Sequence, residues 1–424
     1  MEAGRKISAA ALGVAALLLS GCAGGTTAGA NADAANGTDS RGPITYVQGK
    51  DNNNVIRPLI DKWNAAHPNE KVTFKEQSDK ADQQHDDLVQ NFQAKNADYD
   101  VVSVDVVWTA EFAAKGWLQP LTGKFAVDTA GYLPATVKTG TYNKTLFTLP
   151  QTSDGALLYY RKDLVPSPPK TWDALVSACS VAKQHDMGCY AGQYAQYEGL
   201  TVNASEAINT AGGAIVGEDG KTPAVNTPAA KAGLQNLVDA YKSGVIPKEA
   251  ITYQEEQGRQ AFEDGKLLFM RNWPYAYSLA KTDGSSKVKD SVGIAPLPGK
   301  DGPGASTLGG HNSGISVYSK HKATALDFIK YMTSEESQRF FVTQGSKAPV
   351  LTALYDDKEL NAKLPFLSTL KTSIENAVPR PVTPFYPAVT KAVQDNAYAA
   401  IKGEKSVDQA LTDMGNAIAS AGSK

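Results

Sequence analysis

The sequence predicts an α/β fold arranged as two lobes, and three observations lead to this prediction. Strand-like and helix-like patterns alternate between residues 44 and 104, which is typical of α/β domains. The run from Tyr99 to Val104 is almost continuously apolar, as expected of a buried strand in a mainly parallel sheet. The chain has 424 residues, more than the roughly 250–300 that one hydrophobic core accommodates, so two lobes are expected.

The first lobe is expected to alternate short strands with amphipathic helices. A strand over residues 44–48 ends at Gly49, and apolar residues between 55 and 63 then fall on one helical face. In such sheets ligands lie beyond the carboxyl ends of the strands, which places residues 49–54 and 105–108 at the edge of a candidate site. The next expected elements are a strand over 72–74, a helix over 85–94 and the apolar strand over 99–104.

The rest of the chain supplies the elements of a second lobe, and in each lobe we expect a mainly parallel sheet flanked by helices. Residues 146–153, with Pro150, have the pattern of a segment that crosses between lobes. Thr171 is expected to cap a helix that begins at Trp172. The other expected elements are a strand from 155 to 160, a helix–turn–helix over 204–245, a helix over 257–262, a strand over 266–270, a helix over 323–333 and an amphipathic helical C-terminus from Thr390.

The first 22 residues carry the pattern of a secretory signal. Arg5 and Lys6 precede an apolar run that reaches Leu19, and the sequence LSGC then ends at Cys22. This ending resembles the lipobox of bacterial lipoproteins, in which the cysteine is lipidated and the preceding segment is removed. A transmembrane anchor is the alternative, but the run is shorter than the roughly 20 residues of a spanning helix. We therefore expect a signal peptide over residues 1–21, a lipidated Cys22 and a flexible, polar tether over 22–42.

The composition excludes several classes of protein. The chain has 42 Lys and Arg against 44 Asp and Glu, a net charge of −2, which is not the footprint of a nucleic-acid-binding protein. Its five histidines are scattered, so we expect neither a metal site nor a cofactor. If Cys22 carries lipid, Cys179 and Cys189 remain in an oxidising compartment, where a disulfide is expected and two buried free thiols are the alternative.

Four groups of polar and aromatic residues recur at the ends of expected strands or in turns. Sugars present neighbouring hydroxyls around an apolar ring face, so a sugar site combines carboxylates and guanidinium groups with flat aromatic rings. A phosphate ligand would need a glycine-rich loop that feeds a helix, and the sequence offers no convincing one. The four groups are Asp105 with Trp108, Asp154, the cluster of Trp273 and Tyr275, and Arg380 between two prolines.

Each of these residues also has a structural alternative. Asp105 and Asp154 are of the type that caps helices and turns. Trp273 could belong to the core, although the following proline favours an exposed turn, and Arg380 could pair with a surface acid. An enzyme is a second interpretation, with Asp154 and either Asp105 or Glu111 as the paired carboxylates of a glycosidase. No local signature supports it, and the sequence lacks a Gly-x-Ser-x-Gly elbow.

Several motifs, in order along nearly the whole mature chain, resemble the extracellular solute-binding proteins of carbohydrate ABC importers, in particular the maltose- and trehalose-binding branch. This resemblance implies a periplasmic-binding-protein-like fold that clamps its ligand in the cleft between two α/β lobes. Lobe 1 would comprise residues 43–152 and 313–356, and lobe 2 residues 153–312 and 357–424. The motifs are DVVW (105–108) with GWLQPL (116–121), DGALLYYRKDL (154–164), PAVNTP (223–228), FMRNWP (269–274) and RPVTP (380–384).

The resemblance also implies roles for individual residues. The aspartates are expected to bind hydroxyls, Trp273 to stack on a glucosyl ring, and Arg380 to bridge hydroxyls from the second lobe. Related binders often carry a tryptophan after the Gly-Gly pair at 309–310, where this chain has His311, which exchanges a stacking ring for a hydrogen-bonding imidazole. Residues 51–53 match a loop that contributes a polar group. The candidate ligand-binding residues are Asp51, Asn53, Asp105, Trp108, Asp154, Trp273, Tyr275, Gly310, His311 and Arg380.

We therefore expect a monomeric receptor, anchored by lipid to the outer face of the cytoplasmic membrane. It would capture an α-linked di- or oligosaccharide, such as trehalose, maltose or a maltooligosaccharide, and deliver it to an ABC permease without catalysis. A secreted carbohydrate-active enzyme and a non-transport envelope lipoprotein are the alternatives. Recovery of intact sugar after long incubation would separate the receptor from the enzyme.

Overall fold

The computed structural model describes residues 40–423, so the predicted signal peptide, Cys22 and the tether up to residue 39 lie outside it. Within residues 40–423, no helix is long and apolar enough to cross a membrane. Arg41, at the end of the predicted tether, forms ion pairs with Glu70 and Asp327, both at 2.6 Å. The N-terminal segment therefore joins the folded part of the chain on the surface of the first lobe.

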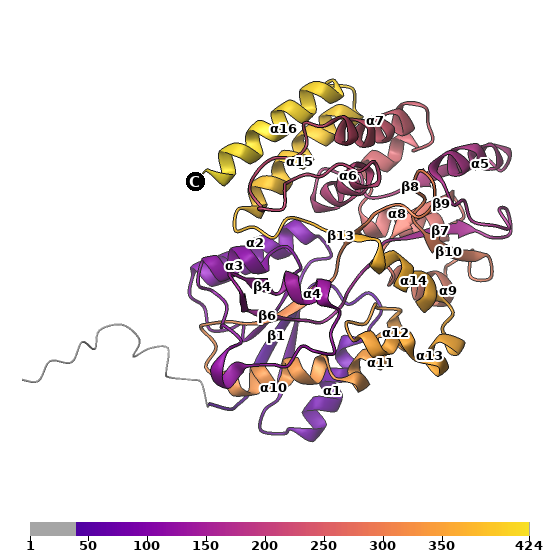
Figure 1. Ribbon diagram of the computed structural model, residues 1–424. Helices are drawn as coiled ribbons and strands as arrows, with labels where there is room; N and C mark the ends of the chain where they lie inside the picture. The colour runs from indigo at the N-terminus through magenta and orange to yellow at the C-terminus, as the bar shows by residue number, and fades with distance from the viewer. Residues whose placement is uncertain (1–39, 424) are drawn as a thin grey trace, which may run out of the picture.

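The first lobe is built on a five-stranded sheet (Figure 1). The first three strands are parallel, and β12 runs antiparallel to both of its neighbours. Successive strand residues point to opposite faces, so Tyr46 packs under α1 and α10 while Val47 packs under α2 and α3. In sheet order the strands are β2 (Val72–Glu76), β1 (Ile44–Gln48), β3 (Val101–Asp105), β12 (His311–Ile315) and β6 (Thr148–Pro150), and the helices are α1 (Ile56–Ala66), α2 (Ala81–Gln93), α3 (Thr109–Ala114), α4 (Pro134–Thr139), α10 (Lys322–Met332) and α11 (Glu335–Gly345).

The second lobe is built on a four-stranded sheet whose strand directions differ from the prediction. Only β8 and β9 are parallel, whereas β7 is antiparallel to both of its neighbours. The prediction of a mainly parallel sheet was wrong here, because an apolar run shows that a strand is buried but not how its neighbours run. The strands in order are β10 (Val292–Pro296), β7 (Leu157–Arg161), β9 (Leu267–Asn272) and β8 (Gly188–Ala191), and the helices are α5 (Trp172–Gln184), α6 (Glu198–Thr210), α7 (Pro228–Lys242), α8 (Glu255–Glu263), α9 (Ala276–Thr282), α15 (Tyr386–Ile401) and α16 (Val407–Gly422).

The chain crosses between the lobes in segments that pair with one another. Asp154 and Gly309 exchange backbone hydrogen bonds of 3.1 and 2.8 Å. A small helical cluster packs against both lobes, because its apolar residues meet Leu133 of the first lobe and Ile294 of the second. The remaining elements are the pair β11 (Ser306–Leu308) and β13 (Ala377–Pro379), the hairpin β4 (Thr141–Tyr142) and β5 (Thr145–Leu146), the helices α12 (Thr352–Asp356), α13 (Lys358–Lys363) and α14 (Phe366–Glu375), and the short 3₁₀ turns at Gly123–Phe125 and Lys248–Thr252.

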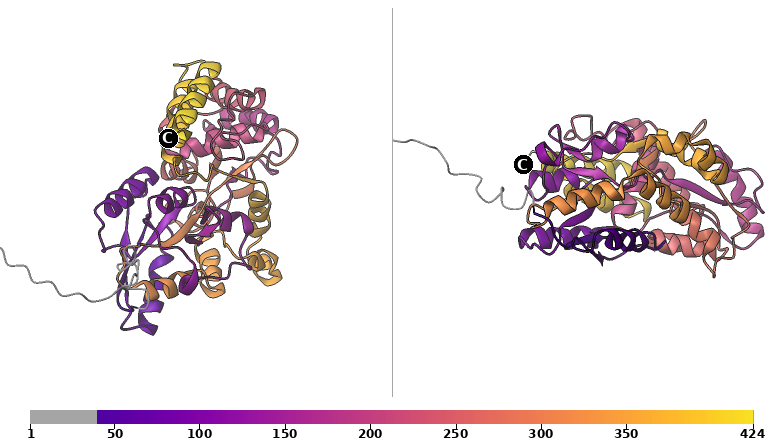
Figure 2. Two further views of the ribbon diagram at one scale, coloured as in Figure 1. Left: turned by 60° about the vertical axis from the view of Figure 1, so that its left-hand side comes forward. Right: turned by 90° about the horizontal axis from the view of Figure 1, so that it is seen from below.

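The two-lobed α/β fold predicted from the sequence is therefore confirmed. Figure 2 shows the lobes from two further sides, with α15 and α16 at the outer end of the second lobe. Thr171 caps α5 as predicted, since its hydroxyl accepts a hydrogen bond from the backbone N–H of Ala174 at 3.2 Å. Cys179 of α5 and Cys189 of β8 are joined by a disulfide. The division at residues 152/153 and 312/313 remains a prediction, and β12, which starts at His311, lies in the first sheet.

Candidate ligand-binding cleft

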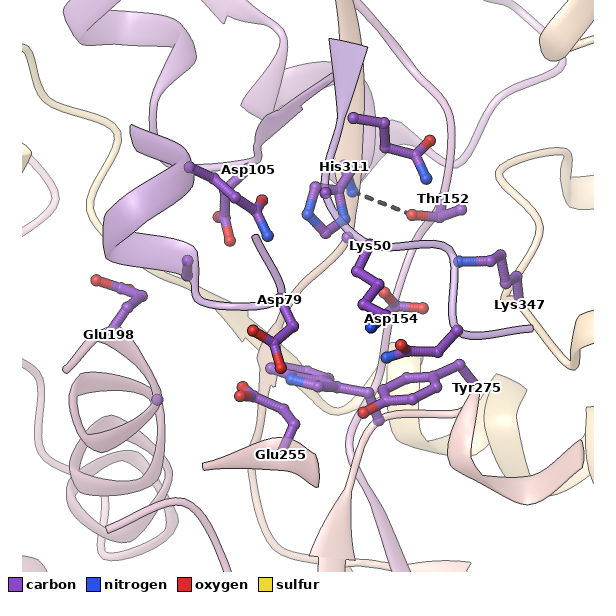
Figure 3. Close-up of a pocket in the computed structure, with 18 of the residues that line it drawn as sticks. Lys50, Asp79, Asp105, Thr152, Asp154, Glu198, Glu255, Tyr275, His311 and Lys347 are labelled. Carbon is purple, nitrogen blue, oxygen red and sulfur yellow. Dashed lines mark hydrogen bonds between the residues drawn. The ribbon is translucent and has the colours of Figure 1, made fainter. Parts of the chain in front are cut away.

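A cavity of about 170 Å³ lies between the two lobes, and residues of both lobes line it (Figure 3). The first lobe contributes residues that follow β1 and β3 and those at the start of β12. The second lobe contributes residues from α6, from α8 and from the turn after β9. The predicted site residues that line this cavity are Asn53, Asp105, Trp108, Asp154, Trp273, Tyr275, Gly310, His311 and Arg380.

Asp51 was also predicted as a ligand contact, and the structure places it elsewhere. Its carboxylate is buried and accepts a hydrogen bond of 2.7 Å from the backbone N–H of Ile56, the first residue of α1. The neighbouring Asn52 and Asn53 line the cavity instead and reach across it to the second lobe. The amide of Asn52 donates to Glu256 at 3.2 Å, and that of Asn53 donates to Ser278 at 2.7 Å. Asp51 thus holds the loop, while the asparagines face the opposite lobe.

Arg380 joins the two lobes at one end of the cavity. Its Nη2 donates to Oδ1 of Asp105, on the first lobe, at 2.9 Å, and its Nη1 donates to Oε1 of Glu198, on the second, at 2.5 Å. All three residues are shielded from bulk solvent, with side-chain exposures of 2% for Arg380, 14% for Asp105 and 7% for Glu198. Separating the partners of a shielded ion pair leaves an uncompensated charge, which costs free energy. The contact therefore depends on the lobes remaining closed.

Glu198 was missed by the sequence analysis, although it is central to this cluster. It begins α6, where its carboxylate accepts hydrogen bonds from the hydroxyls of Tyr386 (2.5 Å) and Thr390 (2.6 Å) as well as from Arg380. Burial raises its pKa, and the nearby positive charge of Arg380 opposes that shift. Glu198 follows a loop without regular secondary structure, and its partners lie almost two hundred residues away in the sequence. No local pattern therefore marked it as a site residue.

Trp273 is held as a flat platform by the second lobe. The guanidinium of Arg271 lies 3.9 Å from the centre of its ring, and the hydroxyl of Tyr159 donates to its backbone carbonyl at 2.7 Å. A side chain at Gly309 would meet the edge of the indole at 2.8 Å, so the crossing segment approaches the ring closely only because residue 309 is a glycine. One ring face is therefore occupied by Arg271, and the platform itself lines the cavity.

Two of the titratable groups that line the cavity are Asp154 and His311, both labelled in Figure 3. Burial raises the pKa of Asp154 to about 6, and the ammonium group of Lys347 opposes this shift. Burial also lowers the pKa of His311, so its imidazole is neutral at pH 7 and has one N–H donor and one acceptor. Gly310, between β11 and His311, has a φ of +114°, and a side chain there would come within 2.2 Å of the Thr152 carbonyl.

Further polar residues line the cavity that the sequence analysis did not single out. Lys50 lies in the segment 49–54 that the rule about carboxyl ends placed at the edge of the site, and the same rule could have found Gln48 and Thr152 at or beside strand ends. Glu255 and Glu256 of α8 do not directly follow a strand in the sequence, and no local pattern marks them. The additional lining residues with polar side chains are Gln48, Lys50, Asn52, Asp79, Gln84, Gln151, Thr152, Glu198, Glu255, Glu256 and Lys347.

The charges around the cavity disfavour an anionic ligand. Six carboxylates line it, against the three cationic side chains Lys50, Lys347 and Arg380. Within residues 40–423, no cluster of three or more His, Cys, Asp or Glu residues is arranged to hold a metal ion. Glu111, one of the acids weighed for a glycosidase, lies outside the cavity lining and binds His85 (2.7 Å) and Lys115 (2.6 Å) instead. The site thus offers neutral, hydroxyl-rich molecules many partners and an aromatic face.

Comparison with known proteins identifies the family. The model of the family described as bacterial extracellular solute-binding protein matches residues 48–339. The chain belongs to this family. A probable ABC transporter-binding protein of Deinococcus radiodurans is 33% identical to it over 347 residues, which cover 78% of this chain and 81% of the relative. The family is extracellular and its members serve transport, so this solute-binding protein is exported.

Two further relatives bear on its ligand. The structure of maltose-bound MalE3 from T. maritima superposes with a TM-score of 0.83 at 34% identity, over 89% of this chain and 98% of that one. A mannitol-binding protein of Pseudomonas aeruginosa is 25% identical over 355 residues, or 76% of this chain and 80% of the relative. The fold is therefore that of periplasmic binding proteins, and this solute-binding protein is close to binders of sugars and polyols.

Proposed function

We propose that this solute-binding protein captures an α-glucoside between its lobes and delivers it to an ABC permease. Maltose, trehalose and short maltooligosaccharides are the ligands that fit the proposal. The observation that carries it is the indole of Trp273, which is backed by Arg271 and faces a cavity rimmed by carboxylates and Arg380. A sugar ring needs this combination of a flat apolar surface and groups that each bind two hydroxyls.

Each residue has a distinct task in this proposal. Trp273 stacks on the C–H face of a glucosyl ring, while Asp105 and Asp154 accept hydrogen bonds from hydroxyls. Arg380 donates to hydroxyl oxygens from the second lobe. His311 both donates and accepts because its imidazole is neutral. The relative with bound maltose supports a glucoside as the ligand.

Capture of a disaccharide requires the lobes to move apart. The cavity of about 170 Å³ is smaller than the roughly 300–1,000 Å³ of most small-molecule sites. It is closed at one end by the contact of Arg380 with Asp105 and at another by that of Asn52 with Glu256. In our proposal the open form admits the sugar. As the lobes close, the sugar hydroxyls form hydrogen bonds with the side chains that contact one another across the cleft.

The proposal includes a lipid anchor at Cys22. The basic, apolar and small residues before Cys22 support it. A Cys22→Ala variant is expected to be released into the medium or to stall in processing. A variant that stays as firmly attached to the membrane as the parent contradicts the anchor without affecting the proposed ligand.

Titration calorimetry against maltose, trehalose, maltotriose and mannitol tests the ligand. Trp273→Ala is expected to weaken α-glucoside binding by about 1–3 kcal/mol, while Tyr398→Ala, an aromatic deletion on α15 outside the cavity lining, leaves it unchanged. Equal affinities of wild type and Trp273→Ala contradict the stacking role. Chromatography of the incubated sugar is expected to return it intact, and hydrolysis would favour the enzyme interpretation.

A polyol receptor is the second candidate. The small closed cavity favours a ligand of one ring or one open chain, and a curated relative is a mannitol-binding protein. Binding of mannitol with no binding of any glucoside would select this candidate.

A further inference from the structure

A second, larger cavity lies within the second lobe. Its volume is about 490 Å³, and it shares no lining residue with the cleft between the lobes. Its walls are the first turn of α5, β8, the facing sides of α6 and α7, and the loop over residues 297–305 that joins β10 to β11. Figure 1 shows these helices within the second lobe. A cavity of this volume is within the usual range for small-molecule sites.

Aromatic rings form one corner of this cavity. The rings of Trp172 and Tyr190 stand at 87° to each other with their centres 5.5 Å apart, and Tyr194, which is buried, lies beside them. Trp172 is only half-buried, so its ring is open to a ligand. Such a corner offers flat faces against which the C–H side of a ring can pack.

Polar groups complete the lining. The half-buried indole of Trp172, the exposed amide of Asn236 and the exposed ammonium group of Lys300 line the cavity. Glu206 also lines the cavity, but its carboxylate already accepts two hydrogen bonds from Arg271, at 2.5 and 2.9 Å, and one from the backbone of Thr307 at 3.1 Å. The rim of the cavity thus offers solvent-exposed donors and acceptors, while the charge of the buried Glu206 is neutralised by Arg271.

We propose that this cavity binds a second, neutral sugar ring. An anion would meet Glu206 and Asp173, with Lys300 as the one cationic lining residue. A cation would gain little, because Arg271 already neutralises Glu206. A wholly apolar molecule would take the amide of Asn236 and the indole N–H of Trp172 out of water without a partner, which is costly. A neutral sugar ring can bind the polar lining groups through its hydroxyls and pack its C–H face against the aromatic corner.

The matched variants come from two exposed alanines. Ala232 of α7 lines the mouth of the cavity, so the side chain of Ala232→Trp would fill it from the surface. Ala174 of α5 is also exposed but does not line the cavity, and Ala174→Trp is therefore the control. Trp172→Phe keeps a ring in the corner and removes the indole N–H. None of these positions lines the cleft between the lobes.

The test is titration calorimetry with maltose and with glucose, followed in parallel by tryptophan fluorescence. Wild type and Ala174→Trp are expected to show two binding events per chain. Ala232→Trp is expected to weaken one event at least tenfold and to leave the other unchanged, and Trp172→Phe is expected to remove the fluorescence change that accompanies the event weakened in Ala232→Trp. Trp273→Ala, in the cleft, is expected to weaken only the other event.

The outcomes separate this proposal from the function of the cleft. A single event in the wild type, or a second event that Ala232→Trp does not weaken, overturns the second site. Loss of the event that depends on Trp273, with the other retained, overturns the proposed function of the cleft and leaves the second site supported. Absence of any sugar binding overturns both.

Discussion

Two buried arginines of this protein, Arg271 and Arg380, have the same chemistry but different surroundings. Each binds a glutamate of α6, since Arg271 donates to Glu206 and Arg380 to Glu198, and the shortest contact is 2.5 Å in both pairs. Among residues 40–423, the side-chain partners of Arg271 belong to the second lobe, including the side chain of Gln193 at 2.9 Å. Arg380, in contrast, also binds Asp105 of the first lobe.

This comparison indicates that the role of each buried arginine depends on which lobe its partners belong to. The presence of an Arg–Glu ion pair does not decide that role. Because the side-chain partners of Arg271 lie in the same lobe as Arg271, a separation of the lobes would leave this pair and its contact with Trp273 intact. The contact between Arg380 and Asp105 must break when the lobes separate. Arg380 also lines the cavity, and its buried Nε–H has no partner among residues 40–423. We therefore assign Arg271 to the fold and propose Arg380 for ligand capture.

The largest effect is expected from removing Arg271. Arg271→Met leaves the carboxylate of Glu206 buried without its counter-charge, which should lower the free energy of unfolding by about 3–5 kcal/mol. Urea denaturation measures it. The double variant Arg271→Met with Glu206→Leu is the control, because replacing both charges with apolar groups should restore most of the loss. A single variant that loses less than about 1 kcal/mol would show that the pair does not hold the lobe together.

The next largest effect is expected from removing Arg380, and it should lower the affinity for sugar more than the stability of the fold. Arg380→Met is expected to weaken sugar binding by about 2–4 kcal/mol, or roughly 30- to 1,000-fold, because a charged donor to the ligand is lost. Folding should suffer less than in Arg271→Met, since Glu198 keeps the hydroxyls of Tyr386 and Thr390. Calorimetry and urea denaturation are compared with those of Arg339→Met, which removes a half-buried, ion-paired arginine outside the cavity lining. A large loss of stability with unchanged affinity would place Arg380 with Arg271 as a structural residue.

A smaller effect, dependent on pH, is expected at Asp154. Its pKa of about 6 in the folded protein is above the roughly 3.9 of an unfolded chain. A raised carboxyl pKa favours the folded state at low pH, and this advantage is lost as the pH rises through 6. Asp154→Asn should therefore be more stable than wild type at pH 8, by about 1–3 kcal/mol, and equal to it near pH 4. Melting temperatures across this range check it, with Asp79→Asn as control, and a gap that does not change with pH would contradict it.

The smallest effect compares two asparagines. Asn52 bonds Glu256 across the cleft, whereas Asn64 bonds the backbone of Val72 within the first lobe. Asn52→Ala is expected to weaken sugar binding by about 0.5–1.5 kcal/mol and to leave unfolding unchanged, and Asn64→Ala is expected to do the reverse. Calorimetry and denaturation of both variants measure the contrast. An equal loss of unfolding free energy in the Asn52→Ala and Asn64→Ala variants would contradict this contrast, because it would show that the contact across the cleft stabilises the fold as much as one within a lobe.

Much of the fold was predictable from the sequence because it rests on short-range patterns. The strand at β1, the apolar face of α1, the cap at Thr171 and the apolar strand at β3 were predicted close to their observed bounds. The strand directions of the second sheet were not, since pairing partners such as β7 and β9 lie far apart in the chain. Nine of the ten predicted site residues line the cleft, as a resemblance to known binders and the rule about strand ends would suggest.

The sequence by itself determined the strands, the helix faces and the inventory of aromatic and charged side chains, because these depend on residues a few positions apart. Only the tertiary structure decided which charges meet. Arg380 and Asp105 are 275 positions apart, and Glu198 carries no local mark of its place between Arg380 and Tyr386. The tertiary structure also places the carboxylate of Asp51 at the start of α1, where it accepts a hydrogen bond from the backbone of Ile56 and does not line the cleft. Contacts between lobes arise from how whole sheets and helices pack, and no pattern within one segment contains that information.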